Sequence, residues 1–260
     1  METAPPLPTR LRYGSDLVLH LVGREFRLRY RRALFGWLWA IGSPLARLLV
    51  FAFVFTKVLP LGIPNYPVFL FTGLIAWSWF QGGVASATSS AVDGRDLVFR
   101  PGLPRAAIPI VSVLTDGLDY LAALPVLALF LIIGDGISFT VLALPVVMLL
   151  QLLLMLGLGF ALCAANVYLR DVRLVVDIVM LLGFYVTPIF YRPESVPEKY
   201  RLVLQLNPMA RLIAAYRDIL VAGRLPAAAP FLGLAAVCIA TCVAGYLIYR
   251  RASPNFVDEL

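Results

Sequence analysis

The chain has 260 residues, of which 61% are hydrophobic and 14% are charged, with a net charge of +7. Soluble globular domains carry about 25% charged residues, so this composition and a mean hydropathy of +0.87 exclude an ordinary soluble domain and favour a membrane protein. A membrane-spanning helix needs about 20 predominantly apolar residues. We therefore expect six spans, which leave no room for a separate soluble catalytic domain.

The N-terminal segment, residues 1–33, is rich in arginine and precedes the first long apolar run. It lacks the compact apolar core and small-residue cleavage site of a signal peptide, so we expect the N-terminus to stay in the cytoplasm. From residue 16 to residue 31, charged and polar residues recur at steps of three and four, while Val18, Val22 and Phe26 occupy another side of the same helix. This spacing predicts an amphipathic helix at the membrane interface.

Residues 34–260 contain six apolar runs that are long enough to cross a bilayer. An even number of spans returns the C-terminus to the starting side, and the Lys and Arg of the short loops place that side in the cytoplasm. We expect an all-α, multi-pass protein of the bacterial inner membrane with both termini cytoplasmic. The expected spans are residues 34–59, 66–87, 106–133, 137–168, 172–191 and 228–249.

A cytoplasmic loop at residues 88–105 joins the second and third expected spans. Charged residues surround the short apolar stretch 97–99, which precedes a break rich in proline and glycine. Charges around an apolar tip predict a docking site for another protein. The candidate docking residues are Asp93, Arg95, Asp96, Phe99 and Arg100.

An outer segment at residues 192–226 is too polar to span the membrane. It carries apolar residues at helical spacing on both sides of the pair Asn207 and Pro208. This pattern predicts two short outer helices, before the last span, that re-enter the membrane partway.

A few charged residues lie inside the expected spans, where an unpaired charge costs several kcal/mol. At about 1.5 Å per residue, Arg47 in the first span and Asp116 in the third lie at matching depths. We therefore predict that Arg47 pairs with Asp116 or with Asp119, one helical turn further on. Two roles stay open for this pair, namely bracing of the helices and lining of a transport path.

An intramembrane enzyme is the first alternative, because Asp116 and Asp119 share one helix face. Neither carboxylate has a partnering histidine, serine or cysteine in a recognised motif, and His20 is the only histidine.

A phosphate-binding loop of the type G-x-x-x-x-G-K-[ST] is also excluded, because neither Lys57 nor Lys199 completes it. If the protein uses ATP, a partner chain must bind the ATP and Mg²⁺.

Aromatic residues cluster near several span ends and interiors. Most aromatic residues of membrane proteins serve as interfacial belts or packing, but an aromatic face can also stack on a sugar ring. We select five as candidates for a translocation path, namely Phe51, Phe55, Phe184, Tyr185 and Tyr191.

The order of local motifs resembles that of ABC-2 type permeases that export polysaccharides. The resemblance covers most of the chain and rests on five pieces. These are Arg24 to Arg31 followed by Leu34-Phe35-Gly36-Trp37 and Pro44; Leu97-Val98-Phe99 with Pro104-Arg105; Asn166 to Val172; Thr187-Pro188-Ile189-Phe190-Tyr191; and Asn207-Pro208 with Tyr216-Arg217.

The resemblance implies a homodimer with two ATPase subunits that passes a lipid-linked polysaccharide outward; no nucleic acid is expected as a partner. Glu25, Arg29 and the segment 93–99 fall where such permeases meet their ATPase. Asn166, Arg170 and Asp171 fall at the inner turn between the fourth and fifth spans, where they equally suit a structural role. Arg47 departs from the apolar first span of the family.

Other classes of transporter remain as alternatives. The first is an ABC-2 exporter of drugs or lipids, which differs from the glycan exporter in its substrate. The second is a secondary transporter, which would work without an ATPase and depend on an ion gradient. The basic surface helix also suits contact with the anionic headgroups of membrane lipids.

Overall fold

The computed structural model describes residues 7–30, 36, 38–58, 60–99, 103–134 and 136–259. Within these ranges the regular structure is helical and contains no strand, so the all-α prediction is confirmed. The α-helices are α1 Leu7–Tyr30, α2 Leu38–Phe53, α3 Tyr66–Asp93, α4 Arg95–Val98, α5 Ala107–Ile133, α6 Leu144–Tyr168, α7 Val172–Val186, α8 Glu198–Leu206, α9 Pro208–Leu220, α10 Ala228–Ala252 and α11 Phe256–Glu259.

Five helical segments of the described chain are long and apolar enough to cross a membrane, namely Ile41–Val58, Tyr66–Asp93, Ala107–Ile133, Phe139–Tyr168 and Ala228–Glu259. The sixth expected span, residues 172–191, is helical only over the 15 residues of α7. At about 1.5 Å per residue this helix is shorter than the hydrocarbon core of a bilayer. The helix stops because Pro188 follows Thr187 and disfavours a helical conformation at the residue before it. The count of six spans therefore stays a prediction.

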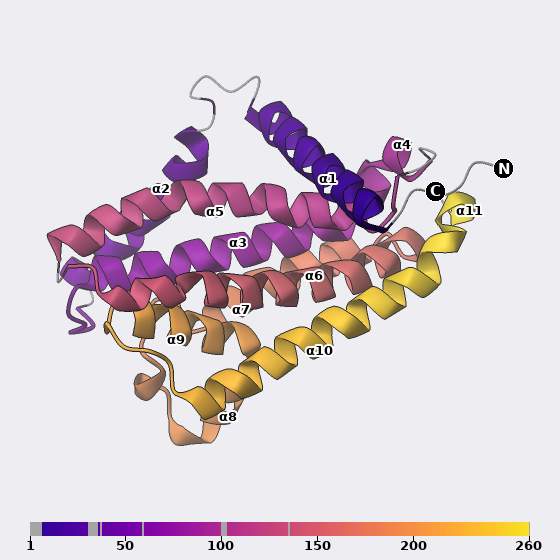
Figure 1. The fold of residues 1–260 in the computed structure, drawn as a ribbon. Helices are drawn as coiled ribbons and strands as arrows, with labels where there is room; N and C mark the ends of the chain where they lie inside the picture. Colours follow the sequence, from indigo (N-terminus) through magenta and orange to yellow (C-terminus); the bar gives the residue numbers. More distant parts are fainter. Residues whose placement is uncertain are drawn as a thin grey trace.

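Helix α3 forms the centre of the bundle. It lies beside α5 and α6, with α2, α7 and α9 also in contact (Figure 1). Of its most apolar window, 83% is buried inside the protein, against 11% for Ile41–Val58. A helix that is apolar all round is normally a buried one, and α3 meets this expectation because other helices surround it.

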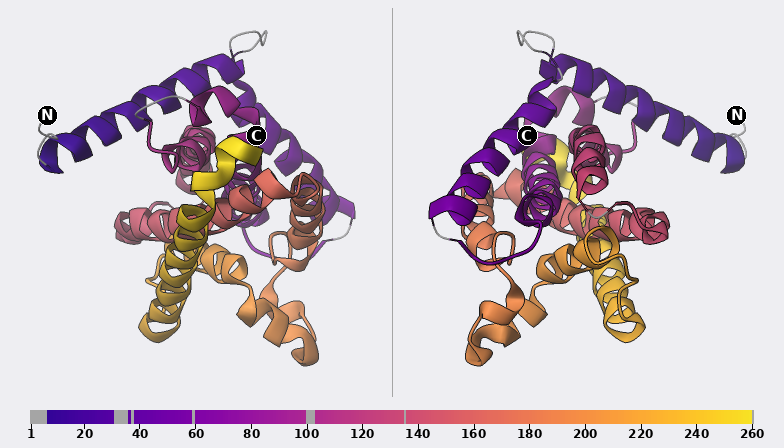
Figure 2. Two further views of the ribbon diagram at one scale, coloured as in Figure 1. Left: turned by 90° about the vertical axis from the view of Figure 1, so that its right-hand side faces the viewer. Right: turned by 90° about the vertical axis from the view of Figure 1, so that its left-hand side faces the viewer.

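The remaining helices cover this centre from different sides. Figure 2 shows α1 on one side of the bundle and α8 with the start of α10 on the opposite side. Helix α1 packs against α5, and α10 packs along α6. The C-terminal part of α1 thus lies against the bundle, whereas its N-terminal part projects away from it (Figure 2).

Two glycines let α6 and α10 approach closely. A Cβ on Gly245 of α10 would collide with the carbonyl oxygen of Gly157, and a Cβ on Gly157 of α6 would collide with the carbonyl oxygen of Thr241. Small residues at helix interfaces allow this kind of backbone approach in membranes. The contact fixes the last long helix on the bundle.

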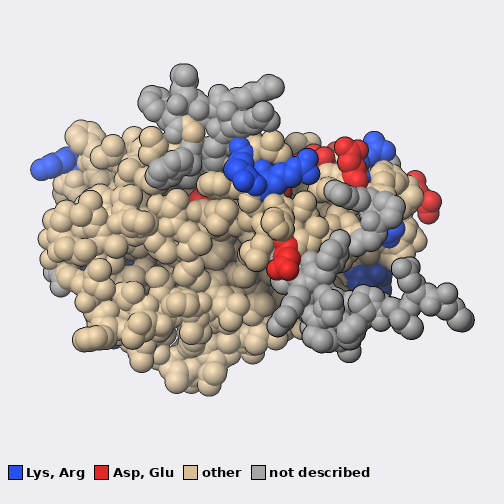
Figure 3. Space-filling view, turned by 45° about the horizontal axis from the view of Figure 1, so that its top comes forward, with Lys and Arg blue, Asp and Glu red and all other residues tan. Residues whose placement is uncertain are grey.

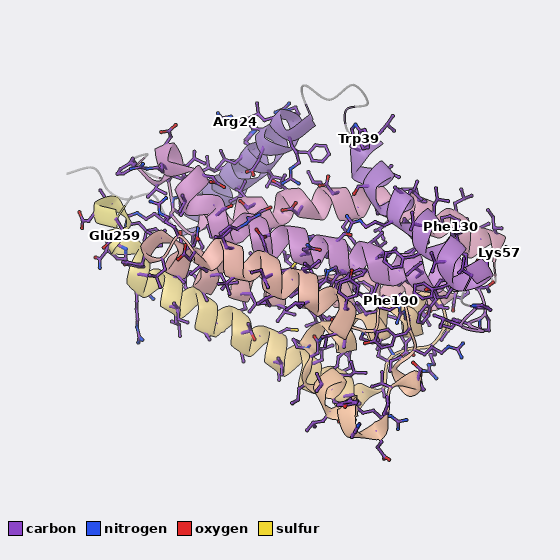
Figure 4. The ribbon with its side chains drawn as sticks, turned by 180° about the vertical axis from the view of Figure 1, so that it is seen from behind. Arg24, Trp39, Lys57, Phe130, Phe190 and Glu259 are labelled. Carbon is purple, nitrogen blue, oxygen red and sulfur yellow. The ribbon has the colours of Figure 1, made fainter. Side chains whose placement is uncertain are left out.

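Hydrogen bonds gather several chain segments at one end of the bundle. The hydroxyl of Tyr249 donates to the carbonyl of Arg105 at 2.9 Å, and that of Tyr168 donates to the carbonyl of Ala252 at 3.2 Å. The guanidinium of Arg105 also donates to the carbonyl of Ser253. In Figure 4, Glu259 lies at this end, while Lys57 and Phe130 lie at the opposite end.

The two short helices expected around Asn207 and Pro208 are α8 and α9. The side chain of Asn207 caps α9 by accepting from the backbone amide of Met209 at 2.9 Å, and it donates to the hydroxyl of Thr187 at 3.0 Å. Helix α8 has no buried residue, whereas α9 buries most of its apolar side chains. Asn207 therefore joins the start of α9 to the residue that follows α7.

Arg217 of α9 holds this region on the bundle. Its guanidinium donates to the carbonyls of Pro188 at 2.6 Å and Ile189 at 2.5 Å. The same group stacks on the ring of Phe69 in α3, 3.4 Å from the centroid. Three segments far apart in the sequence thus meet at one buried arginine.

We expect Gly245→Ala to destabilise the protein by about 3 kcal/mol or more, because the added methyl group meets backbone rather than a movable side chain. Thermal unfolding of the purified protein in detergent measures the effect. The matched control is Gly233→Ala on the same helix, where a Cβ meets only the far end of Arg211 at 3.5 Å. Equal melting temperatures for the two variants would contradict the close approach of α6 and α10.

We expect Arg217→Met to lower the free energy of unfolding by about 1–3 kcal/mol, because it leaves the buried carbonyls of Pro188 and Ile189 without donors. It should also speed proteolytic cleavage between α7 and α8. The control is Arg224→Met, which removes an exposed ion pair with Asp218 whose contribution to stability is expected to be small. A smaller effect at Arg217 than at Arg224 would show that Arg217 does not hold the outer segment.

Candidate functional site

An ion pair lies between the N-terminal helix and the bundle. Nη1 of Arg29 in α1 donates to Asp116 Oδ1 at 2.7 Å and to Asp119 Oδ2 at 2.9 Å, both on α5. The prediction that Arg47 pairs with these carboxylates is therefore wrong, and Arg29 takes that position. The physical reason is that α1 packs along α5. Arg29 lies near the C-terminal end of α1, and this packing places its guanidinium beside the two carboxylates.

The sequence contained a signal for this contact. Val22, Glu25, Phe26 and Arg29 follow one another at steps of three, one and three, which places them on one face of α1. Val22 is buried, so the two charged residues share the face that packs on the bundle. A charged residue on such a face needs a buried partner, and Asp116 and Asp119 supply it for Arg29.

The environment shifts the pKa of both charged residues on this face of α1. Burial disfavours the charged form of Arg29, but Asp116 and Asp119 outweigh burial and raise its pKa. Burial also raises the pKa of Glu25; nearby Arg29 opposes this effect and Asp116 adds to it. The carboxyl group of Glu25 therefore takes up a proton more readily than a solvated glutamate.

Arg47 lies on α2, where its Nη2 donates to Ser43 Oγ at 3.2 Å. It lines a cavity of about 250 Å³ between α2, α3 and α5. The same cavity is lined by Asp116 and Asp119, so Arg47 is near the carboxylates without forming an ion pair with either. Aromatic side chains form much of the remaining wall, namely Trp39, Trp79 and Tyr120.

A larger cavity of about 700 Å³ opens at the end of the bundle that carries α4. Three of the predicted docking residues line it, namely Glu25, Asp93 and Asp96. Arg24 and Arg173 add positive charge to the wall, together with four serines from α3 and α5. The structure thus brings α1 and α4 together around one polar cavity.

Helix α4 exposes its charges and divides its apolar residues. Asp93, Arg95 and Asp96 are exposed and Phe99 is 47% exposed, whereas Val98 is buried. Val98 packs against Ile108 and the end of α6, so only part of the apolar stretch 97–99 is available to another protein. Arg100, also predicted to dock, lies outside the described residues.

Charged side chains are unevenly distributed over the surface. Figure 3 draws one face of the molecule. Most of the Lys, Arg, Asp and Glu visible there lie over one half of this face, and the other half is almost uncharged. The charged half includes the end that carries α4 and α11. This distribution suits a protein whose uncharged part lies in lipid and whose charged end faces water.

The inner turn between α6 and α7 is fixed by Asn166. This buried side chain accepts from the backbone amide of Arg173 at 3.2 Å and so caps the start of α7. Arg170 and Asp171 are exposed beside it. The turn therefore gives Asn166 a structural role and leaves its two charged neighbours at the surface.

Arg173 is a residue that the sequence analysis did not single out. Its Nε donates to Asp177 Oδ2 at 3.0 Å, and its Nη1 donates to the carbonyl of Ala85 and to Ser89 Oγ. These bonds hold the start of α7 against α3. The sequence signal for this role was the position of Arg173 in the first turn of an expected span. A basic residue there must either reach water or bind polar partners.

All five predicted path residues gather in one aromatic cluster around Phe190, which the prediction left out. The ring of Phe190 lies 5.6 Å from that of Phe55, 6.0 Å from Phe184 and 5.1 Å from Tyr191, measured between centroids. Figure 4 labels Phe190 within the bundle. The further members are Phe51, at 6.0 Å, and Tyr185, at 6.3 Å, which is 56% exposed.

The described residues contain no candidate metal site. No group of three His, Cys, Asp or Glu side chains in these ranges lies close enough together to hold a metal ion.

Three similar proteins carry names that describe export or transport. The chain is 34% identical over 247 residues to the O-antigen export system permease protein RfbA of Myxococcus xanthus, which covers 94% of this chain and 95% of that protein. It is 31% identical over 217 residues to RfbA of Klebsiella pneumoniae, covering 83% and 84%. It is 26% identical over 233 residues to the polysialic acid transport protein KpsM of Escherichia coli, covering 87% and 90%.

Residues 16–221 match the family described as ABC-2 type transporter, a stretch that includes the described part of α1 from Asp16 onward, the central bundle and both short outer helices. The helical architecture with several apolar helices agrees with this match. The chain belongs to the ABC-2 type transporter family of multi-pass membrane proteins.

Proposed function

We propose that the protein is the membrane-spanning subunit of an ATP-driven exporter that moves a lipid-linked polysaccharide outward across the inner membrane. The observation that carries the proposal is the similarity to O-antigen export permeases along 94% of the chain. The working unit is a homodimer with two ATPase subunits, and these partners bind the ATP and Mg²⁺. The chain itself supplies the path and the surface that receives motion from the ATPase.

The charged end supports the contact with the ATPase. Helix α4 projects exposed charges and Phe99 beside the 700 Å³ cavity that it shares with α1. An ATPase subunit that enters this cavity contacts both α4 and α1, and Glu25 lies in the cavity wall. Only contacts that differ between two states can transmit the work of ATP hydrolysis. The proposed coupling residues are Glu25, Asp93, Arg95, Asp96, Phe99 and Arg100, with Arg29 acting through α5.

The aromatic cluster supports a path for sugar rings. Aromatic faces give apolar contact without demanding one fixed set of hydrogen bonds, which suits a polymer that must slide. Tyr185 exposes more than half of its surface at the edge of the cluster. Phe51, Phe55, Phe184 and Tyr191 line the path in this proposal, with Phe190 at their centre.

The proposed topology has six crossings with both termini in the cytoplasm. Helix α7 supplies most of the fifth crossing, and the turn after Val186 completes it. Arg250 and Arg251 at the end of α10 agree with a cytoplasmic C-terminus. Residues 1–33 form the N-terminal segment at the inner interface, where the basic surface of α1 also meets lipid headgroups, and residues 34–260 form the permease domain.

Co-purification with the candidate ATPase, followed by reconstitution into proteoliposomes, tests the function. We expect ATPase activity to rise when a lipid-linked glycan is added and the glycan to reach the opposite leaflet. Stimulation by drugs or simple lipids instead would point to another class of exporter. Transport by this chain without an ATPase would overturn the proposal.

We expect Asp96→Arg to uncouple ATP hydrolysis from export, because it reverses an exposed charge on α4 without disturbing a buried contact. Export should fall at least about tenfold, which corresponds to about 1.4 kcal/mol, while membrane insertion stays unchanged. The matched control is Asp258→Arg, an exposed carboxylate in α11. Equal loss of export in both variants would mean that α4 has no special place in coupling.

We expect Tyr185→Ala to slow export by about three- to tenfold, since one aromatic contact contributes about 0.5–1.5 kcal/mol beyond its buried area. The ATPase rate without substrate should not change. Phe139→Ala is the control, because Phe139 is 92% exposed and lies away from the cluster. Export assays that show the same rate for Tyr185→Ala as for the unmodified protein would remove Tyr185 from the path.

A further inference from the structure

The segment that carries α4 is attached to the bundle at two points. At its start, α4 follows α3 directly, and the backbone amide of Gly94 donates to the carbonyl of Ser90 at 3.0 Å. At its end, the chain enters α5 through Arg105, just before Ala107, the first residue of that helix. In Figure 1, α4 lies at the same end of the bundle as α11. The position of α4 therefore depends on what holds Arg105.

The end of α10 holds Arg105 through both its backbone and its side chain. The hydroxyl of Tyr249 donates to the carbonyl of Arg105 at 2.9 Å. In the opposite direction, the guanidinium of Arg105 donates to the carbonyl of Ser253, the C-cap residue of α10. The last carbonyls of a helix have no partners within the helix, and a cation near them is favourable. Arg105 thus caps α10, and two hydrogen bonds of opposite direction fix it there.

Phe256 of α11 fixes the ring of Tyr249. Phe256 is fully buried, and its ring meets that of Tyr249 edge to face, at 5.4 Å between centroids and 87° between the planes. Tyr168 of α6 contacts the ring of Phe256 at 6.5 Å, and its hydroxyl donates to the carbonyl of Ala252 at 3.2 Å. Edge-to-face contact is a favoured arrangement of aromatic rings. The next residue, Val257, is 43% exposed, so Phe256 rather than Val257 turns inward.

Helix α4 also has an apolar connection to the end of α10. Val98, the buried residue of α4, belongs to the same apolar cluster as Tyr249 and Phe256. One helical turn before Tyr249, Gly245 brings α10 against the backbone of α6. A displacement of α4 that keeps the contacts of Val98 and Arg105 therefore moves the end of α10 as well.

We propose that Tyr249, Ser253 and Phe256 form a clamp that holds Arg105 and so links the position of α4 to the end of α10. The three residues are positioning residues, because they act on α4 through Arg105 and Val98. The clamp gives α4 a connection to α10 and α6 beside its direct connection to α3. The binding of an ATPase at α4 rests on the proposed function, whereas the holding of Arg105 does not.

Amide hydrogen exchange of the purified chain in detergent tests the clamp, because it measures local opening without global unfolding. We expect Tyr249→Phe, which keeps the ring and removes only the hydroxyl, to speed exchange at residues 95–99 by about three- to tenfold. Exchange in the centre of α3 should not change. The matched control is Tyr246→Phe on the same helix, at a tyrosine that is 42% exposed. Equal exchange at residues 95–99 in the two variants would overturn the clamp.

Two further pairs of variants separate the cap on α10 from the packing of α11. Arg105→Met should speed exchange at residues 95–99, whereas Arg105→Lys keeps a cation for the carbonyl of Ser253 and should stay within about twofold of the unmodified chain. Phe256→Ala should act like Arg105→Met, and Val257→Ala is its control. If Arg105→Lys exchanges as fast as Arg105→Met, or Phe256→Ala as slowly as Val257→Ala, the clamp is wrong.

Addition of the partner ATPase to the reconstituted chain tests the link to α10. We expect bound ATPase to slow exchange at residues 249–256 by about fivefold or more, since a partner that fixes α4 also stabilises whatever is coupled to it. Arg105→Met should lose this protection. Equal protection in Arg105→Met would show that the ATPase covers these residues directly, and no protection in the unmodified chain would show that the coupling is absent; either result overturns the link.

The proposed function and the clamp fail in different ways. If no ATPase binds the unmodified chain, the proposed function is rejected, and the exchange rates of the chain alone still decide whether the clamp holds Arg105. Neither measurement uses a glycan, so the choice of transported substrate does not affect the result.

Discussion

Charged groups that folding removes partly or wholly from water need partners that the protein itself supplies. Three arginines show how this constraint organises the structure. Arg29 ties α1 to α5, Arg173 ties α7 to α3, and Arg217 ties α9 to α3 and to the backbone after α7. Each one joins segments that are distant in the sequence. The peripheral helices are thereby fixed on a centre that is otherwise apolar.

The apolar centre and the glycine contact provide the frame for these ties. Helix α3 is enclosed by its neighbours, and Gly157 and Gly245 bring α10 against α6 at backbone distance. In lipid, contact between two apolar helices yields little hydrophobic free energy, because the lipid tails are apolar too. Close packing and polar partners therefore hold the helices together. In this structure, small residues allow the close packing and the three arginines provide the polar partners.

This division has a consequence for transport. The end that we propose to face the cytoplasm carries α4 and the larger cavity, whereas the aromatic cluster lies along α2, α7 and the turn that follows α7. Between them lie the carboxylates of α5 and the two arginines from α1 and α2. In our proposal an ATPase subunit contacts α4 and α1, and movement of α1 reaches α5 through the ion pair of Arg29 with Asp116 and Asp119. Only contacts that differ between two states can transmit such a movement.

The sequence by itself determined the helical membrane class, most of the span positions, the two short helices around Asn207 and the membership suggested by its motifs, because these depend on local hydrophobicity and on proline, glycine and capping residues. It also selected five aromatic residues that the fold brings together. Only the tertiary structure decided that Arg29 rather than Arg47 meets Asp116 and Asp119, that Phe190 is the centre of the aromatic cluster, and that α7 ends at Val186. Depth along a helix can be counted from the sequence, but the partner of a charge depends on how helices pack in three dimensions.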